Sequence, residues 1–175
     1  NQKKILDIGF GNGENLLEFK KRGHKIFGTE IRKKLLKFFL KKNNLKKENF
    51  YISDITKDLP QIKKKFHLII MIDVLCYLDM NAQRKVFNWV DDHLYKKSLF
   101  LFSFTQNDLI QKKNKKIDNW EISEKFYKKI KVNFDKKNPM KFLNFQNLMK
   151  KFTYTNLKII GSHFDVCTYS KKNSS

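Results

Sequence analysis

The residues best suited to chemistry lie near the start of the chain, in the segment Ile5-Leu6-Asp7-Ile8-Gly9-Phe10-Gly11-Asn12-Gly13. Three glycines at alternate positions follow an apolar run that is typical of a buried strand. Glycine at such a turn lets the backbone approach a ligand closely, because no side chain stands in the way. The segment therefore predicts a ligand-binding loop, although a tight strand-to-helix turn without a ligand would use the same residues.

Two properties of this loop bear on the kind of ligand. Dinucleotide-binding loops place their third glycine one residue later, where this chain has Glu14. Asp7, two residues before the first glycine, would repel a pyrophosphate and would attract a ligand with a cationic amino-acid end. The loop therefore favours a ligand with a cationic end over a nicotinamide dinucleotide.

The elements that must position this loop follow from the pattern of apolar residues. Short apolar runs alternate with longer amphipathic ones, as expected of a parallel sheet with helices on both faces. The expected helices span residues 14–22, 32–43, 82–94 and 142–152, and the expected strands span 4–8, 25–30, 50–53, 67–72, 99–104, 157–160 and 164–169. The predicted class is α/β: a seven-stranded, mostly parallel sheet flanked by helices that closes with an antiparallel hairpin.

Polar residues follow the next predicted strands as well. Glu30 ends the second strand, Ser53 and Asp54 follow the third, and Asp73 follows the fourth. Parallel strands end at the same edge of a sheet, where open α/β folds bind ligands, so we expect these side chains to share a site with the glycine loop. Glu30 and Asp54 would also serve as helix caps, and that explanation stays open.

With these sites in this order, the chain resembles the class I S-adenosylmethionine-dependent methyltransferases over nearly its whole length. The resemblance implies a Rossmann-like domain with S-adenosylmethionine as cofactor. It also implies that Glu30 accepts both ribose hydroxyls, that Ile31 packs on the adenine and that Asp54 takes the adenine amino group. The residues implied to bind the cofactor are Asp7, Gly9, Phe10, Gly11, Asn12, Gly13, Glu30, Ile31, Ser53, Asp54, Ile55, Asp73 and Val74.

The segment after the fourth strand departs from the family. Members often have Asp-Val-Leu-Glu-His there, whereas this chain has Cys76 and Tyr77 at the last two positions. Tyr77 would line the acceptor pocket or pack in the core. Cys76 has no preceding proline and no paired cysteine, which argues against a covalent nucleophile. The sequence therefore names no catalytic residue, and positioning of the acceptor would suffice for a methyl group activated by a sulfonium.

Composition limits the class of protein further. Cys76 and Cys167 fit neither a metal site nor a disulfide framework, and metal-ligand spacing is also lacking among His24, His67, His93 and His163. No apolar run is long enough to cross a membrane. We expect a cytoplasmic protein without a bound metal.

The charge of the chain leaves two kinds of acceptor open. A formal net charge of +21 suits a nucleic-acid partner. However, only Arg22, Arg32 and Arg84 among the 38 basic residues are arginines, the residue type best suited to phosphate. Solvated lysine faces explain the charge as well. We expect a small-molecule acceptor, with an RNA methyltransferase and a non-catalytic cofactor-binding subunit as alternatives.

A chain of 175 residues is expected to form one domain, residues 1–175. The polar, lysine-rich segment 105–140 is expected to cover the substrate pocket. Class I methyltransferases usually carry a helical extension before the first strand, and this chain starts within a few residues of that strand. An N-terminal cap is therefore expected to be absent.

Overall fold

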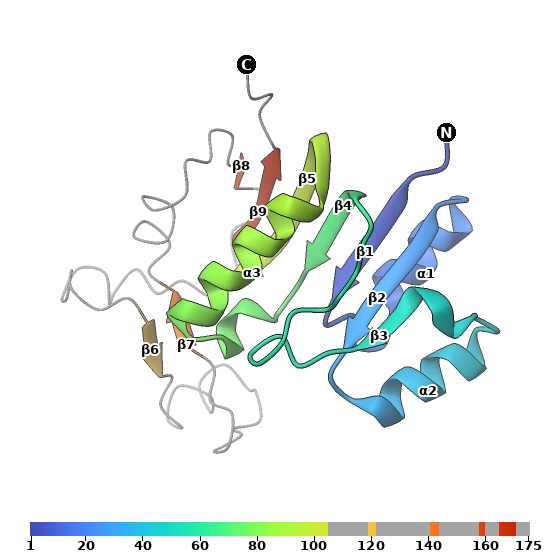
Figure 1. Ribbon diagram of the computed structural model, residues 1–175, viewed down its shortest axis with the longest axis horizontal. Coiled ribbons are helices and arrows are strands. Elements are labelled where there is room, and N and C mark those ends of the chain that lie inside the picture. The colour runs from blue at the N-terminus through green and yellow to red at the C-terminus, as the bar shows by residue number, and fades with distance from the viewer. Residues whose placement is uncertain (105–118, 122–140, 144–157, 160–164, 171–175) are drawn as a thin grey trace.

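The computed structural model describes residues 1–104, 119–121, 141–143, 158–159 and 165–170 of the chain. Its main sheet has the strand order β3-β2-β1-β4-β5-β9-β8 (Figure 1). The first five strands pair in parallel, and β9 pairs antiparallel with both β5 and β8. The bounds are β1 Lys4–Ile8, β2 Lys25–Glu30, β3 Phe50–Ile52, β4 Phe66–Met71, β5 Leu94–Phe104, β8 Lys158–Ile159 and β9 Asp165–Ser170. The expected α/β class is confirmed.

Helices cover both faces of this sheet. The helical elements are α1 Glu14–Lys21, α2 Lys33–Lys42, α3 Met80–His93 and two short 3-10 turns, η1 Lys47–Asn49 and η2 Leu75–Tyr77. On one face, Leu16 of α1 and Phe39 of α2 pack with Ile26 of β2. On the other, Val86 of α3 packs with Phe27 and Phe100, and Figure 1 shows α3 in front of β5. Side chains alternate along each strand, so one sheet supplies both cores.

Local signals explain where the helices begin and end. Helix α3 starts at Met80, two residues before the expected start, because the side chain of Asp79 accepts a hydrogen bond from the Ala82 N–H at 2.8 Å. Helix α1 ends before Gly23, whose φ of 80° gives the left-handed turn expected there.

Two expectations from the sequence need correction. Strand β5 begins at Leu94 and not at residue 99, and the register of its pairing with β4 shifts between Phe66 and Leu68. Polar residues follow Leu94, so the apolar pattern of the sequence did not predict a strand beginning there. Residues Lys141–Leu143 form strand β7, which pairs antiparallel with β6, Asn119–Glu121, so a helix beginning at Phe142 is wrong. The backbone of Phe142 pairs with that of Trp120 and is extended where the helical spacing predicted a helix.

Other parts of the expected organisation lie outside the described residues. These are positions 144–152 of the expected last helix and all of the segment 105–140 except strand β6 at 119–121.

Candidate functional site

A cleft of about 660 Å³ lies at the carboxyl ends of β1, β2, β3 and β4. Each of these strands contributes its last residues or the loop that follows it. The lining residues are Asp7, Gly9, Phe10, Gly11, Asn15, Thr29, Glu30, Ile31, Arg32, Ser53, Asp54, Ile55, Thr56, Ile72, Asp73, Val74, Tyr77 and Leu78.

The cleft brings together most of the residues that the sequence singled out. Asn12 and Gly13 are the two predicted cofactor-binding residues that do not line it. The sequence missed Asn15, Thr29, Arg32, Thr56, Ile72 and Leu78. Asn15 lies two residues beyond Gly13, in the first turn of α1, and Arg32 directly follows Ile31, just before α2. Extending each predicted loop to the next helix would have included both.

The three loop glycines have different roles, although all have positive φ values of 71°, 57° and 78°. A Cβ at Gly9 would lie 2.6 Å from Cγ2 of Val74, and a Cβ at Gly13 would overlap the Phe39 ring. A Cβ at Gly11 would meet nothing closer than the Arg32 guanidinium, at 4.0 Å. Gly9 and Gly13 therefore permit close packing, whereas Gly11 keeps space open in the cleft.

The Phe10 side chain belongs to the core. It is buried, and its ring packs on Phe39 and Phe50 with centroid distances of 4.8 and 5.9 Å. Gly28 of β2 makes room for it, since a Cβ there would lie 2.6 Å from the Phe10 ring. The burial of the ring leaves the backbone of Phe10 as its natural contribution to the cleft.

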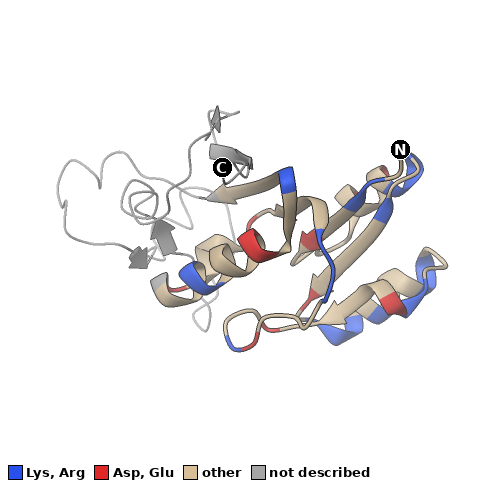
Figure 2. Cartoon of the chain, turned by 45° about the horizontal axis from the view of Figure 1, so that its top comes forward, with Lys and Arg blue, Asp and Glu red and all other residues tan. Residues whose placement is uncertain are grey.

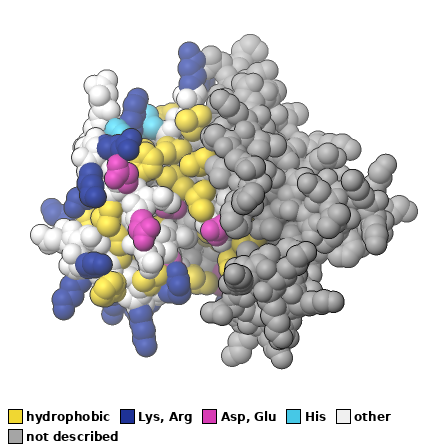
Figure 3. Space-filling model, turned by 180° about the vertical axis from the view of Figure 1, so that it is seen from behind, with side chains coloured by type: hydrophobic (Ala, Val, Ile, Leu, Met, Phe, Trp, Pro, Cys, Tyr) yellow, Lys and Arg dark blue, Asp and Glu magenta, His cyan; other side chains and the backbone are white. Residues whose placement is uncertain are grey.

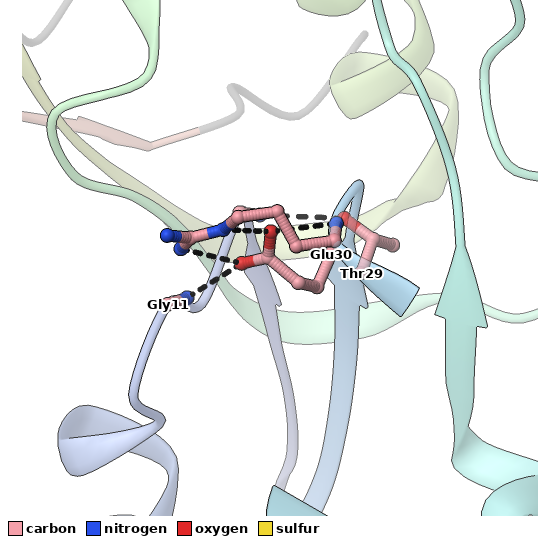
Figure 4. Close-up of polar contacts among 5 residues, drawn as sticks. Gly11, Thr29 and Glu30 are labelled. Atoms are coloured by element: carbon pink, nitrogen blue, oxygen red, sulfur yellow. Dashed lines mark hydrogen bonds and ion pairs between the residues drawn. The ribbon is translucent and has the colours of Figure 1, made fainter. Parts of the chain in front are cut away.

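Glu30 is the centre of the polar network in this cleft (Figure 4). Its side chain is 3% exposed. Oε1 accepts hydrogen bonds from the backbone N–H of Arg32 at 3.0 Å and from Arg32 Nε at 2.9 Å. Oε2 accepts from the Gly11 N–H at 3.1 Å and from Arg32 Nη2 at 3.4 Å. Glu30 therefore ties the end of β2 to the glycine loop.

The pKa of Glu30 reflects these contacts. Burial alone would raise it, but the hydrogen bonds and positive charge of Arg32, together with the Gly11 N–H, outweigh burial and lower the pKa of this carboxyl. Glu30 is consequently a carboxylate at neutral pH.

Asp7 is a second buried carboxyl group and behaves differently. It is 2% exposed. Burial raises its pKa to about 7, and the nearby charge of Glu30 adds to the increase, while a hydrogen bond from Asn15 opposes it. A cation placed beside Asp7 would favour its ionised form, so this group is suited to a positively charged ligand.

Asp73 stands at the end of β4 in a strained backbone conformation. Its φ is 55°, which is uncommon for a residue other than glycine. Ser103 of β5 holds it in place: the Asp73 N–H donates to Ser103 Oγ at 2.8 Å, and Ser103 Oγ donates to Asp73 Oδ1 at 3.0 Å. Such strain is often retained where a side chain must be aimed into a site.

Asp54 takes part in a local turn in the loop that follows β3. Its Oδ1 accepts from the Thr56 N–H at 3.1 Å and from Thr56 Oγ1 at 2.6 Å, and Lys57 lies 3.5 Å from Oδ2. The Thr56 hydrogen bond is the largest cause of a lowered pKa at Asp54. No helix begins in the described segment between β3 and β4, so Asp54 is not a helix cap; its Oδ1 holds a local turn, and the residue lines the cleft.

Cys76 and Tyr77 lie in the 3-10 turn η2 after β4. Cys76 is buried, and burial together with the charge of Asp73 raises the pKa of its thiol to about 12. A thiol of this kind is a poor nucleophile. Tyr77 is 38% exposed and lines the cleft.

Within the part of the chain that the structure describes, no three His, Cys, Asp or Glu side chains gather where they could hold a metal ion. No helix among the described residues is both long and apolar enough to span a membrane.

The family model for a methyltransferase domain matches residues 5–97. The chain belongs to this methyltransferase domain family. The matched residues run from β1 into β5 and include every loop that lines the cleft. The cleft is therefore part of the methyltransferase domain itself. No curated protein sequence matches the chain.

Solved structures share the methyltransferase fold. A methyltransferase of Methanosarcina mazei, described as S-adenosylmethionine-dependent, has a TM-score of 0.70 and 13% identity over 98% of this chain and 93% of its own. The glycopeptide N-methyltransferase MtfA, solved with S-adenosylmethionine, has a TM-score of 0.69 and 13% identity over 99% and 83%. The PH0226 protein of Pyrococcus horikoshii OT3 has a TM-score of 0.66 and 16% identity over 98% and 84%. At these identities the likeness concerns the fold alone.

Proposed function

We propose that this chain binds S-adenosylmethionine in the cleft and transfers its methyl group to a small-molecule acceptor. The observation that carries the proposal is the position of Glu30, a buried carboxylate at the end of β2 that faces the Gly11 loop. Membership of the methyltransferase family and the fold shared with MtfA, which was solved with this cofactor, support the choice of ligand.

The residues present fit this cofactor in shape and charge. Gly11 leaves open the space that a side chain would fill. Glu30 would bind the ribose hydroxyls, and Ile31, an apolar side chain that is 57% exposed, would cover the adenine with Asp54 nearby. Asp7 would bind the cationic amino-acid end. The bound cofactor supplies a methyl group activated by its sulfonium charge, so the chain has to orient the acceptor and exclude water.

The distribution of charge favours a small acceptor over RNA. Asp7, Glu30, Asp54 and Asp73 line the cleft, and among its described lining residues Arg32 is the only basic one. Arg32 is already paired with Glu30. A cleft with this balance would repel a phosphate backbone.

Lysines lie mainly elsewhere on the described part of the chain. We call the group at the amino ends of the parallel strands the amino-edge lysines: Lys3, Lys4, Lys25, Lys63, Lys64, Lys65, Lys96 and Lys97. Figure 2 shows blue segments at this end of the sheet and along α2, and Figure 3 shows basic side chains projecting from the periphery. None of the lysines in the described part of the chain lines the cleft, which argues against an RNA acceptor.

Calorimetric titration tests the cofactor, and product formation tests the acceptor. We expect heat on adding S-adenosylhomocysteine and none with a nicotinamide dinucleotide; the opposite result would overturn the cofactor assignment. With methyl-labelled S-adenosylmethionine, we expect product from a panel of small amines and alcohols. Product from RNA alone would favour the RNA methyltransferase, and binding without any product would favour a non-catalytic subunit.

A further inference from the structure

The Glu30 carboxylate has little capacity left for new hydrogen bonds (Figure 4). Each carboxylate oxygen accepts about two hydrogen bonds. Oε1 already accepts two at 3.0 and 2.9 Å, both from Arg32. Oε2 accepts one good hydrogen bond from Gly11 at 3.1 Å and a long one from Arg32 Nη2 at 3.4 Å. Two further donors can be accommodated only if the guanidinium gives up its contacts.

The guanidinium is the partner that is able to leave. The Arg32 side chain is 65% exposed, whereas that of Glu30 is 3% exposed. A displaced guanidinium would therefore be solvated by water, while a displaced Glu30 would lose the Gly11 and Arg32 backbone donors that hold it in place. The backbone N–H of Arg32 does not depend on the position of its side chain.

We propose that the Arg32 side chain competes with ribose hydroxyls for the Glu30 carboxylate and so sets the affinity of this site for nucleosides. The inference rests on the proposed function, which assigns the ribose to Glu30. Binding of a ribonucleoside exchanges the Arg32 Nε and Nη2 contacts for two hydroxyl contacts, and the ion pair forms again when the nucleoside leaves. The net affinity is weaker than the hydroxyl contacts alone would give, which favours release of product.

Removing the guanidinium is expected to tighten nucleoside binding. Arg32→Met keeps the length of the side chain but has no donor, and we expect it to lower the Kd of S-adenosylhomocysteine about two- to fivefold, within the range for a partly exposed ion pair. Arg32→Lys retains a single point charge without the planar fork and should give a smaller decrease. Titrations at pH 8 keep Glu30 ionised in every variant, since Arg32 contributes to its lowered pKa.

Two controls separate competition at Glu30 from other effects of charge. Lys34→Met removes an exposed cation of α2 that forms no ion pair among the described residues, and it should leave the Kd unchanged. The ligand 2′,3′-dideoxyadenosine lacks both hydroxyls, so Arg32→Met should not tighten it, while adenosine should bind more tightly.

The outcomes distinguish this inference from the proposed function. Unchanged or weaker S-adenosylhomocysteine binding by folded Arg32→Met and Arg32→Lys would overturn competition by Arg32. Equal tightening of adenosine and the dideoxy ligand would overturn it too, because Glu30 would not be involved. If neither the original chain nor any folded variant binds S-adenosylhomocysteine, the proposed function itself is wrong.

Discussion

The two ends of the parallel strands carry opposite chemistry. At the carboxyl ends, Asp7 and Glu30 are almost completely buried, and Asp73 is held in a strained conformation. At the amino ends, the amino-edge lysines are exposed except for the partly buried Lys4. None of them takes part in the ion pairs found among the described residues.

The residues at the two edges differ in how much they oppose folding. Burying a carboxyl group opposes folding, so the burial of Asp7 and Glu30 at one edge indicates a requirement other than stability. A positive φ does not separate the edges, since Asp73 has it at one and Lys97 at the other. A solvated lysine costs little. Its charge still acts on neighbouring groups. The pKa of His67 is lowered mainly by burial and further by the charges of Lys3 and Lys4. The buried carboxyl groups therefore support the proposed ligand site at the carboxyl edge.

Matched glycine substitutions at the two edges should show the largest difference. Gly13 and Gly23 have similar φ values of 78° and 80°, but a Cβ would overlap the Phe39 ring at Gly13 and meet nothing within 4 Å at Gly23. We expect Gly13→Ala to lower the free energy of unfolding by about 2 to 4 kcal/mol and Gly23→Ala by about 1 kcal/mol. Urea unfolding measures both free energies of unfolding. Equal decreases would show that packing against Phe39 does not restrict position 13.

Asp7→Asn should stabilise the fold at the expense of ligand binding. The folded-state pKa of about 7 lies above the ordinary value of 3.8, so between these pH values the folded chain retains a proton that the unfolded chain loses. Stability therefore falls as pH rises from about 4 to about 7. Asparagine removes this loss, and we expect a gain of roughly 2 to 4 kcal/mol at pH 8 and almost none at pH 4.

Urea unfolding of the original chain and of Asp7→Asn at both pH values measures this effect, with S-adenosylhomocysteine affinity as the second readout. The account predicts a more stable variant that binds more weakly at pH 8. A difference in stability that does not change with pH would mean that Asp7 does not titrate in this range.

Substitution of amino-edge lysines should have the smallest effect. We expect the triple variant Lys63→Gln, Lys64→Gln and Lys65→Gln to change the free energy of unfolding by less than about 0.5 kcal/mol, as is usual for exposed charges. S-adenosylhomocysteine affinity should be unchanged, because these residues do not line the cleft. A large loss of affinity would contradict the assignment of the site to the carboxyl edge alone.

Much of the cleft was predictable because its residues follow strongly apolar strands. The bounds of β1 and β2 match the sequence prediction, and this places Asp7, Gly11 and Glu30 at one edge without any knowledge of packing. A ligand site is expected at this edge because the parallel strand order brings the ends of distant segments together.

Contacts between distant side chains were not predictable. Phe10 stands between two loop glycines and would pass for a ligand contact, but Gly28 on the neighbouring strand gives its ring a place in the core. The pairing of Arg32 with Glu30 depends on a side-chain conformation that no sequence pattern encodes. The β6–β7 pairing at Phe142 joins residues more than twenty positions apart, so local helical spacing gave the wrong element.

The central claim is that the Glu30 carboxylate binds the ribose of an S-adenosyl ligand, and calorimetric titration of S-adenosylhomocysteine into Glu30 variants tests it most directly. We expect Glu30→Ala to weaken binding about 10- to 100-fold, in line with hydrogen bonds to a charged group, and Glu30→Gln to weaken it less because one acceptor oxygen remains. The free energy of unfolding of Glu30→Ala should fall by only about 1 kcal/mol, since the freed N–H groups of Gly11 and Arg32 can reach water. Unchanged affinity per folded molecule, with a large loss of stability, would show that Glu30 is a structural tie and contradict the account.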